Sequence, residues 1–260
     1  TYMADFYQVY YVNGLIAGAL TETDTVGYVA AFPIPEVKRH INAFARGVQE
    51  VNPDAKVVVR WIYAWFDPAA AREATEALIA DGADVFAYTE DTPTVPQTAA
   101  ARGLVSFSHY ADMSQYAPDT LASGQLVHWG VLTTDIIRKI MDGTYTADNL
   151  DDVDYFWLMA EGAVEVGVAP GQVIHPNYEQ QLKDTTVQSE EFGEISVYDL
   201  VMRRIEQLSA DPVGFEPFAG PLTDRKGNQV YAEGEGPTLL DLLGMQWAAP
   251  NVEGPWEGEP

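Results

Sequence analysis

The chain of 260 residues is long enough for one large domain or two lobes, and its hydrophobic content of 47% is ample for a packed core. Its 39 acidic residues outnumber its 14 basic ones, for a formal net charge of -25, so repulsion opposes binding to nucleic acid or to an anionic membrane surface. Because the chain has no cysteine, disulfides, thiolate metal sites and cysteine nucleophiles are excluded.

The first twenty residues, TYMADFYQVYYVNGLIAGAL, give no targeting signal. They lack the basic start and the cleavage site of a signal peptide, so localisation cannot be read from them. The sequence also has no run of about 18 apolar residues that could span a bilayer.

Four short apolar runs rich in β-forming residues occur between residues 25 and 130, and a helical segment follows each of them. The predicted strands are residues 26–32, 56–63, 84–88 and 104–108. Short connections between nearly continuous apolar strands predict a parallel sheet with helices on both faces. The expected fold class is therefore α/β.

Two helices in this part are marked by their spacing and capping residues. After the first strand, apolar residues recur at helical intervals; they are Ile41, Phe44, Ala45, Val48 and Val51. Pro68 suits the first position of the next helix, with Asp67 as its cap and an end near Gly82. The narrow apolar face of that helix is formed by Ala70, Ala74, Ala77 and Leu78.

The remaining elements follow a less regular pattern. A helix is predicted over residues 131–143, then a strand pair around Gly162 and a helix over residues 197–208. The stretch GPLTDRKGNQVYAEGEG has a Lys-Gly turn pair between two arms and is typical of a hairpin. The last ten residues, NVEGPWEGEP, are rich in Gly, Pro and Glu and predict a frayed end.

Aromatic and acidic side chains alternate just after the predicted strands, in the stretches FPIP, YAWFDP, TEDTP, HYADM and HW. In an open parallel sheet, ligands bind beyond the carboxyl ends of the strands. Flat rings can stack on a planar ligand, while carboxylates and hydroxyls can accept hydrogen bonds from ring N–H and amino groups. The pattern predicts a cleft for a planar molecule, with prolines stiffening the turn that leaves Phe32 at its mouth.

The stretch GYVAAFPIPEVKRHINAFARGVQEVNPDAKVVVRWIYAWFDP, with ALIADGADV and HYADM after it, resembles the basic membrane protein (BMP) family of ABC-transporter solute-binding proteins. The likeness is to the branch taken to carry purine nucleobases, and it covers nearly the whole chain. It implies the type I periplasmic-binding-protein fold, in which two α/β lobes joined by three crossing segments close on the ligand.

The resemblance also implies a domain organisation. Residues 1–24 would be the end of the N-terminal lobe, and residues 25–128 the C-terminal α/β lobe. Residues 129–145 would be a helix returning to the N-terminal lobe, and residues 146–260 segments that cross between lobes and an acidic C-terminal region. Family members begin with several further βα units, so the N-terminal lobe is expected to be incomplete in this chain.

The function implied by the resemblance is capture of a purine-type base, such as adenine, guanine, hypoxanthine or xanthine, and its delivery to ABC permease subunits. The protein would be monomeric and extracytoplasmic, either periplasmic or membrane-anchored. Positions that match the family's pocket are Phe32, Trp65, Glu90, Asp91, Asp112 and Trp129.

These residues also have purely structural interpretations. Phe32 and Trp65 could be core residues at strand ends, because most aromatic residues serve packing, and Trp129 could pack at a hinge between lobes. The acidic residues could cap the helices that follow them; these are Glu90, Asp91 and Asp112.

The sequence offers no enzymatic or metal-binding motif. The residue types of a Ser-His-acid triad occur between residues 106 and 112, but no G-x-S-x-G elbow is present. The four histidines are scattered without an H-x-x-x-H pair, and GAVEVGVAPG matches no phosphate-binding loop. We therefore expect a binding protein without catalytic residues, metal or cofactor.

Three other functions remain open at this point. A nucleoside-binding protein of the same family would need groups that recognise ribose, and a ligand-sensing module would need no transporter. An enzyme that acts on a purine is the third. The sequence does not select the base, and it does not explain the acidic segment 172–194.

Overall fold

A computed structural model describes residues 1–259 of the chain as an α/β fold around one seven-stranded sheet. In spatial order its strands are β13 (Val252–Glu253), β3 (Lys56–Trp61), β2 (Thr25–Ala30), β4 (Val85–Thr89), β5 (Val105–Ser108), β6 (Leu121–Val127) and β8 (Val164–Val166). Neighbouring strands run parallel except β6 and β8, which are antiparallel. The expected α/β class with a mainly parallel sheet is confirmed.

The helices are α1 (Tyr7–Leu20), α2 (Pro35–Val51), α3 (Pro68–Ala80), α4 (Thr94–Ala100), α5 (Trp129–Met141), η1 (Leu150–Asp152), α6 (Pro176–Asp184), α7 (Val197–Leu208) and α8 (Leu239–Leu243). Three two-stranded pairs complete the fold: β1 (Tyr2–Ala4) with β7 (Tyr155–Trp157), β9 (Thr186–Ser189) with β10 (Gly193–Ser196), and β11 (Leu222–Thr223) with β12 (Gln229–Tyr231). No helix among residues 1–259 is both long and apolar enough to cross a membrane.

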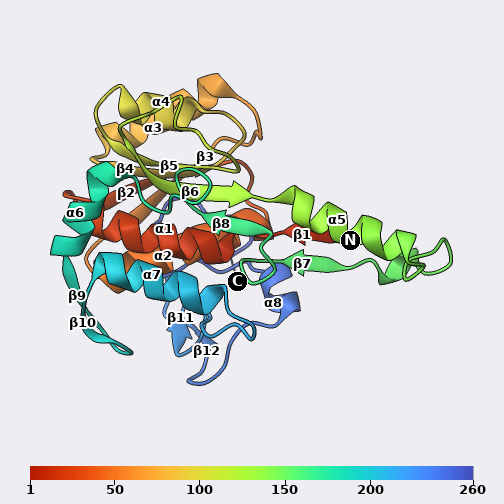
Figure 1. The fold of residues 1–260 in the computed structure, drawn as a ribbon. Coiled ribbons are helices and arrows are strands. Elements are labelled where there is room, and N and C mark those ends of the chain that lie inside the picture. The colour runs from red at the N-terminus through yellow and green to blue at the C-terminus, as the bar shows by residue number, and fades with distance from the viewer. Residues whose placement is uncertain (260) are drawn as a thin grey trace.

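Helices cover both faces of the sheet, as the sequence predicts. In Figure 1, α3 and α4 lie on one side of the sheet, and α1, α2 and α7 lie on the other. The side chain of Asp67 caps α3 by accepting hydrogen bonds from the backbone N–H groups of Ala69 and Ala70, which confirms the predicted start of this helix. The buried positions of α3 differ slightly from the predicted stripe; they are Ala71, Ala74, Thr75 and Leu78.

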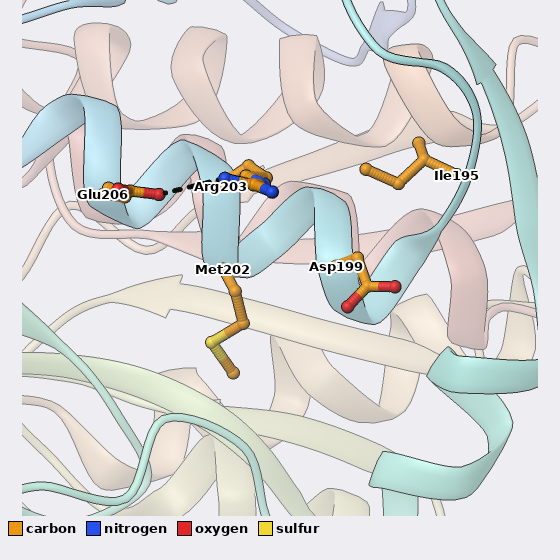
Figure 2. A pocket seen from close by; sticks show the side chains of 5 residues that line it. All are labelled: Ile195, Asp199, Met202, Arg203 and Glu206. Carbon is orange, nitrogen blue, oxygen red and sulfur yellow. Dashed lines mark hydrogen bonds and ion pairs between the residues drawn. The ribbon is translucent and has the colours of Figure 1, made fainter.

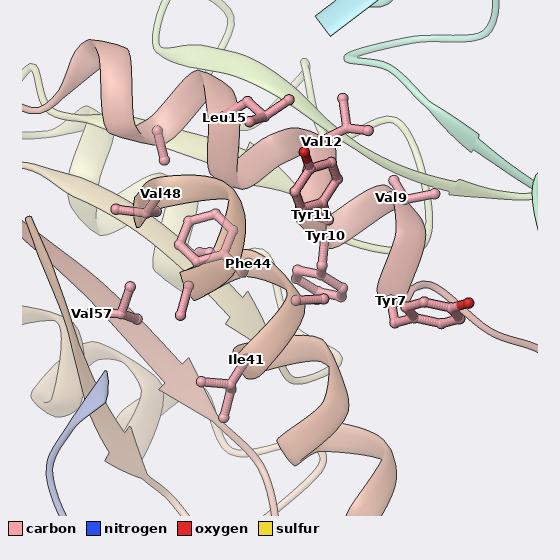
Figure 3. Packing of buried hydrophobic residues seen from close by; sticks show 14 of the residues in the cluster. Tyr7, Val9, Tyr10, Tyr11, Val12, Leu15, Ile41, Phe44, Val48 and Val57 are labelled. Atoms are coloured by element: carbon pink, nitrogen blue, oxygen red, sulfur yellow. The ribbon is translucent and has the colours of Figure 1, made fainter. Parts of the chain in front are cut away.

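The main core lies where α1 and α2 pack together beneath the sheet (Figure 3). Helix α1 is buried around nearly its whole circumference, as expected of a helix between other layers. Two glycines let the backbones approach closely: a Cβ atom on Gly14 would lie 2.1 Å from the carbonyl oxygen of Phe44, and one on Gly47 would lie 2.1 Å from that of Tyr11. These positions therefore fix the distance between the two helices.

Two predictions for the second half of the chain are wrong. The strands on either side of Gly162 do not pair with each other: β7 pairs with β1, and β8 pairs with β6 at the sheet edge. Residues 251–259 are not frayed as predicted, because β13 adds a parallel strand beside β3 and Trp256 is only 9% exposed. Both errors have the same cause, since the partner strands are distant in the sequence.

Other elements agree with the predictions. Helix α7 spans residues 197–208, and β11 and β12 form the predicted hairpin. Helix α5 begins two residues earlier than expected, and its apolar side is mostly uncovered, with Leu132 as its buried residue. The acidic segment 172–194 forms α6 and most of the β9–β10 hairpin.

The close approach of α1 and α2 predicts a large effect of one methyl group. Replacing Gly47 with Ala should lower the free energy of unfolding by about 3 kcal/mol, because the new Cβ would collide with backbone rather than with a movable side chain. Gly130→Ala is the matched control, since a Cβ at this position in α5 meets nothing within 4 Å. Urea unfolding of both variants tests this, and equal stability of the two would contradict it.

Candidate ligand-binding site

The carboxyl ends of five neighbouring strands lie at one edge of the sheet. Strands β3, β2, β4, β5 and β6 are parallel, so the loops that follow them emerge on the same side. All six candidate pocket residues lie in or directly after these loops. The structure therefore places them along one edge, where open parallel sheets bind ligands.

Phe32 and Trp65 form an aromatic pair at this edge. Phe32 follows β2 and is half-buried, while Trp65 follows β3 and is 39% exposed. Their ring centroids are 5.5 Å apart, with an angle of 55° between the ring planes. Since the rings are tilted and remain partly accessible, the pair presents an apolar surface for a flat molecule.

Asp91 is joined to this pair through the backbone. Its N–H donates a hydrogen bond of 2.7 Å to the carbonyl of Trp65, which links the loop after β4 to the loop after β3. The Asp91 side chain is exposed, and partial burial of its carboxyl raises the pKa from the ordinary value. Asp91 thus lies next to the aromatic pair, and its carboxylate has no hydrogen-bond partner among residues 1–259.

Glu90 has a different environment from Asp91. It is 1% exposed, and its carboxylate accepts hydrogen bonds from both the backbone N–H (2.8 Å) and the hydroxyl (3.0 Å) of Thr92. Helix α4 begins after Pro93 with no side-chain cap, so neither acidic residue has the capping role that the sequence allowed. Glu90 instead stabilises the conformation of the loop that carries Asp91, through its hydrogen bonds with Thr92.

The pKa of Glu90 rises from its ordinary value of 4.5 to about 7. Burial is the main cause, and the charge of Asp91 adds to it, while the hydrogen bonds from Thr92 act in the opposite direction. A carboxyl with this pKa exchanges its proton near neutral pH. The loop after β4 therefore carries a group that gains or loses a proton near neutral pH.

Asp112 and Trp129 lie farther along the same edge. Asp112 is exposed and accepts a hydrogen bond of 2.8 Å from the N–H of Ser114, which forms a local turn. Trp129 is the first residue of α5 and is 41% exposed. Strand β6 is three strands from β2, or roughly 14 Å, so Trp129 lies well apart from the Phe32 pair.

Sequence reasoning did not select two tyrosines that mark this edge. Tyr63 follows β3 with a φ of 54°, and Tyr110 follows β5 with a φ of 64°. Such angles are uncommon for bulky residues and require support from the surrounding structure. The Tyr110 ring packs edge-on against Phe6 and His109, with centroids 4.9 and 4.4 Å away. Aromatic residues after strands were the available signal, but a backbone angle cannot be read from sequence.

His109 does not form a triad. It is 2% exposed, and its Nδ1 atom lies 2.9 Å from the hydroxyl of Tyr10. The hydroxyls of Ser106 and Ser108 are buried without a partner among the described residues. Burial lowers the pKa of His109 to about 3, so the imidazole is neutral at ordinary pH and serves as a core residue.

A separate hollow of about 500 Å³ lies on β10 and α7 (Figure 2). It is lined by Ile195, Asp199, Met202, Arg203 and Glu206, and Arg203 is paired with Glu206 at 3.5 Å. None of these side chains is aromatic, and none follows a strand of the main sheet. This hollow therefore lacks the aromatic residues at strand ends that the sequence analysis predicts for the site.

Comparisons with known sequences identify a family for this chain. The sequence model of a family described as ABC transporter substrate-binding protein PnrA-like matches residues 5–200. A protein of Brucella abortus named as a purine-binding protein is 31% identical over 97% of this chain and 64% of its own length. A protein of Haloferax volcanii, provisionally named as an ABC transporter glucose-binding protein, is 38% identical over 73% of this chain and 46% of its own length. The chain thus spans less than two thirds of either relative.

Two solved structures have a fold similar to that of this chain. A transcriptional activator of the comK gene from Bacillus halodurans has a TM-score of 0.61 and 20% identity, covering 80% of this chain and 64% of that one. An ABC transporter solute-binding protein from Aeropyrum pernix has a TM-score of 0.59 and 19% identity, covering 81% and 64%. At these identities the likeness concerns the fold alone, and it confirms the expected type I binding-protein architecture.

The titration of Glu90 predicts a pH-dependent stability. Because the folded state binds this proton more tightly than the unfolded chain, the stabilisation is complete below about pH 4.5 and is lost as the pH rises through about 7. Wild-type protein should therefore lose about 1–3 kcal/mol relative to Glu90→Gln between about pH 5.5 and about pH 8.5. Urea unfolding of both proteins at the two pH values measures this loss, and an unchanged difference would refute it.

Proposed function

The chain belongs to the family of PnrA-like ABC transporter substrate-binding proteins, and on that premise we propose that it captures a purine-type nucleobase outside the cytoplasm. The base would then be delivered to the permease subunits of an ABC importer. The observation that carries this proposal is the Phe32–Trp65 pair beside the carboxylate of Asp91 at the strand-end edge. The purine-binding relative from Brucella supports the ligand class.

Each side chain has a role suited to a flat, nitrogen-rich ring. Trp65, as the more exposed ring of the pair, would stack on the base, and Phe32 would back it. Asp91 would accept hydrogen bonds from ring N–H or amino groups, while Glu90 would hold the loop in place from beneath. Asp112 and Trp129 lie too far along the edge to reach the same base and would contact the closing lobe.

The proposed mechanism is closure of two lobes around the base, which ligand contacts shared by both lobes would favour. The exposed apolar side of helix α5 is the observation that supports a second lobe. This helix extends away from the body of the fold beside β1 and β7 in Figure 1, and its side chains Val131, Ile137, Ile140 and Met141 are 42 to 83% exposed. Such an apolar face is expected to be covered by other protein. We therefore assign α5 and the loop after it to that lobe.

Other ligands are compatible with parts of the site. A nucleoside would add a ribose, whose hydroxyls would need further hydrogen-bonding groups. The name of the Haloferax relative points to a sugar as ligand. Aromatic rings with carboxylates also suit sugar rings, so the site is compatible with this alternative. A sensory role without a transporter would use the same binding chemistry, and the genomic neighbourhood of the gene would separate it from transport.

The proposal is tested by tryptophan-fluorescence titration with adenine, guanine, hypoxanthine, xanthine, their nucleosides and glucose, with calorimetry on each hit. Saturable binding of a free base at micromolar or lower concentration supports the proposal. Preference for a nucleoside or for glucose would replace the ligand class and keep the family. Turnover of a purine by the purified protein would point to an enzyme.

Trp65 should be essential for affinity but not for the fold. We expect Trp65→Ala to weaken base binding at least about tenfold, because the stacking surface is lost. Trp65→Phe is the matched variant, since it keeps an aromatic ring and should retain most of the affinity. Calorimetry gives the dissociation constants, and thermal melting confirms that both variants fold. An unchanged dissociation constant for Trp65→Ala would remove this residue from the pocket.

A further inference from the structure

The last described residues of the chain run along the edge of the sheet toward the candidate site. Residues 251–259, called here the C-terminal strap, begin beside β3, where Val252 pairs with Val57. Farther along, the indole N–H of Trp61 donates a hydrogen bond of 2.7 Å to the carbonyl of Pro255. Since β3 ends at Trp61, the strap reaches the strand end from which the Trp65 loop begins.

Gly254 allows the strap to lie close to β3. Its φ is 113°, and a Cβ atom at this position would lie 2.6 Å from the carbonyl oxygen of Val59. Both the angle and the contact exclude larger residues without movement of the strap. The strap is therefore seated directly on the strand.

A buried lysine fixes the far end of the strap. Lys38 is 1% exposed, and its ammonium group donates hydrogen bonds to the side chain of Gln246 and to the carbonyl of Glu257. The indole N–H of Trp256 donates a hydrogen bond of 2.7 Å to the backbone carbonyl of Gln246. These contacts hold the backbone of Glu257 in one place.

From this fixed backbone, the side chain of Glu257 reaches the loop after β3. Its Oε1 atom accepts a hydrogen bond of 2.9 Å from the hydroxyl of Tyr63. Tyr63 is the residue with the positive φ of 54°, two positions before Trp65. The other side of the loop is held by the bond from Asp91 to the Trp65 carbonyl. Because a strained residue persists only when its surroundings hold it, the Glu257 contact is part of that support.

We infer that the C-terminal strap is a positioning element of the binding site: Glu257 holds Tyr63 and thereby sets the orientation of Trp65. The consequence for ligand affinity rests on the proposed function, whereas the structural coupling does not. Glu257 and Tyr63 act through Trp65 and need not touch the ligand.

The coupling is tested without ligand by the indole N–H resonances in spectra of ¹⁵N-labelled protein. The chain has six tryptophans, and Trp65→Phe identifies the signal of Trp65 by its loss. In Glu257→Ala and in Tyr63→Phe, the Trp65 signal should shift or broaden. Glu257→Gln should restore its position, because an amide oxygen still accepts the hydrogen bond.

Glu253→Ala is the control on the same strap, since Glu253 pairs with Lys56 at 3.1 Å near the start of β3. It should leave the Trp65 signal unchanged. In calorimetry, Glu257→Ala and Tyr63→Phe should weaken base binding roughly three- to tenfold, and Glu253→Ala should not. A Trp65 signal at its wild-type position in both Glu257→Ala and Tyr63→Phe would overturn the inference. If the wild-type protein binds no base at all, the proposed function fails, while the spectra still decide on the strap.

Discussion

A buried ion pair between Asp5 and Arg39 joins stretches of the chain that are far apart in the sequence. The Arg39 guanidinium also donates to the carbonyl of Leu242 and lies over the ring of Phe156, with a distance of 5.6 Å to the centroid. Burial alone would raise the pKa of Asp5, but the charge of Arg39 and the contacts with Arg39 and His40 hold it well below its usual range. Removing one partner would leave a buried charge, at a cost of about 3–5 kcal/mol. The ion pair therefore fixes the relative arrangement of the start of α1, the first turns of α2 and the β1–β7 pair. The loop with Phe32 leads directly into α2, so its position depends on this arrangement.

Sequence reasoning was most successful where an element is specified by neighbouring residues. The strands and helices between residues 25 and 89 follow from apolar spacing and from signals such as Asp67 and Pro68 before α3. Strand β6 was not predicted, because Ser123, Gly124 and Gln125 interrupt the apolar pattern of its residues LASGQLV. The partners of β7, β8 and β13 depend on tertiary contacts across more than thirty residues, which local patterns do not contain.

The candidate site was predictable at the level of the sheet edge but not of single contacts. The rule that ligands bind beyond parallel strand ends located Phe32, Trp65 and Asp91 near one another. It could not distinguish the buried Glu90 from the exposed Asp91, although they are adjacent in sequence. The positive φ of Tyr63 and its bond to Glu257 were also invisible, because the two residues are separated by most of the chain. Whether all six positions contact a ligand stays a prediction.

The late position of β13 in the sequence has a consequence for synthesis of the protein. Strand β3 lies at the edge of the sheet until residues 252–253 pair with it, and those residues are synthesised long after β3 itself. Until then β3 presents unpaired backbone N–H and C=O groups, which can recruit strands from other nascent chains. Its exposed Lys56 and Arg60 provide charges that oppose such pairing. Strand β13, in the segment that borders the candidate site, therefore also protects the edge of β3 from pairing with other chains.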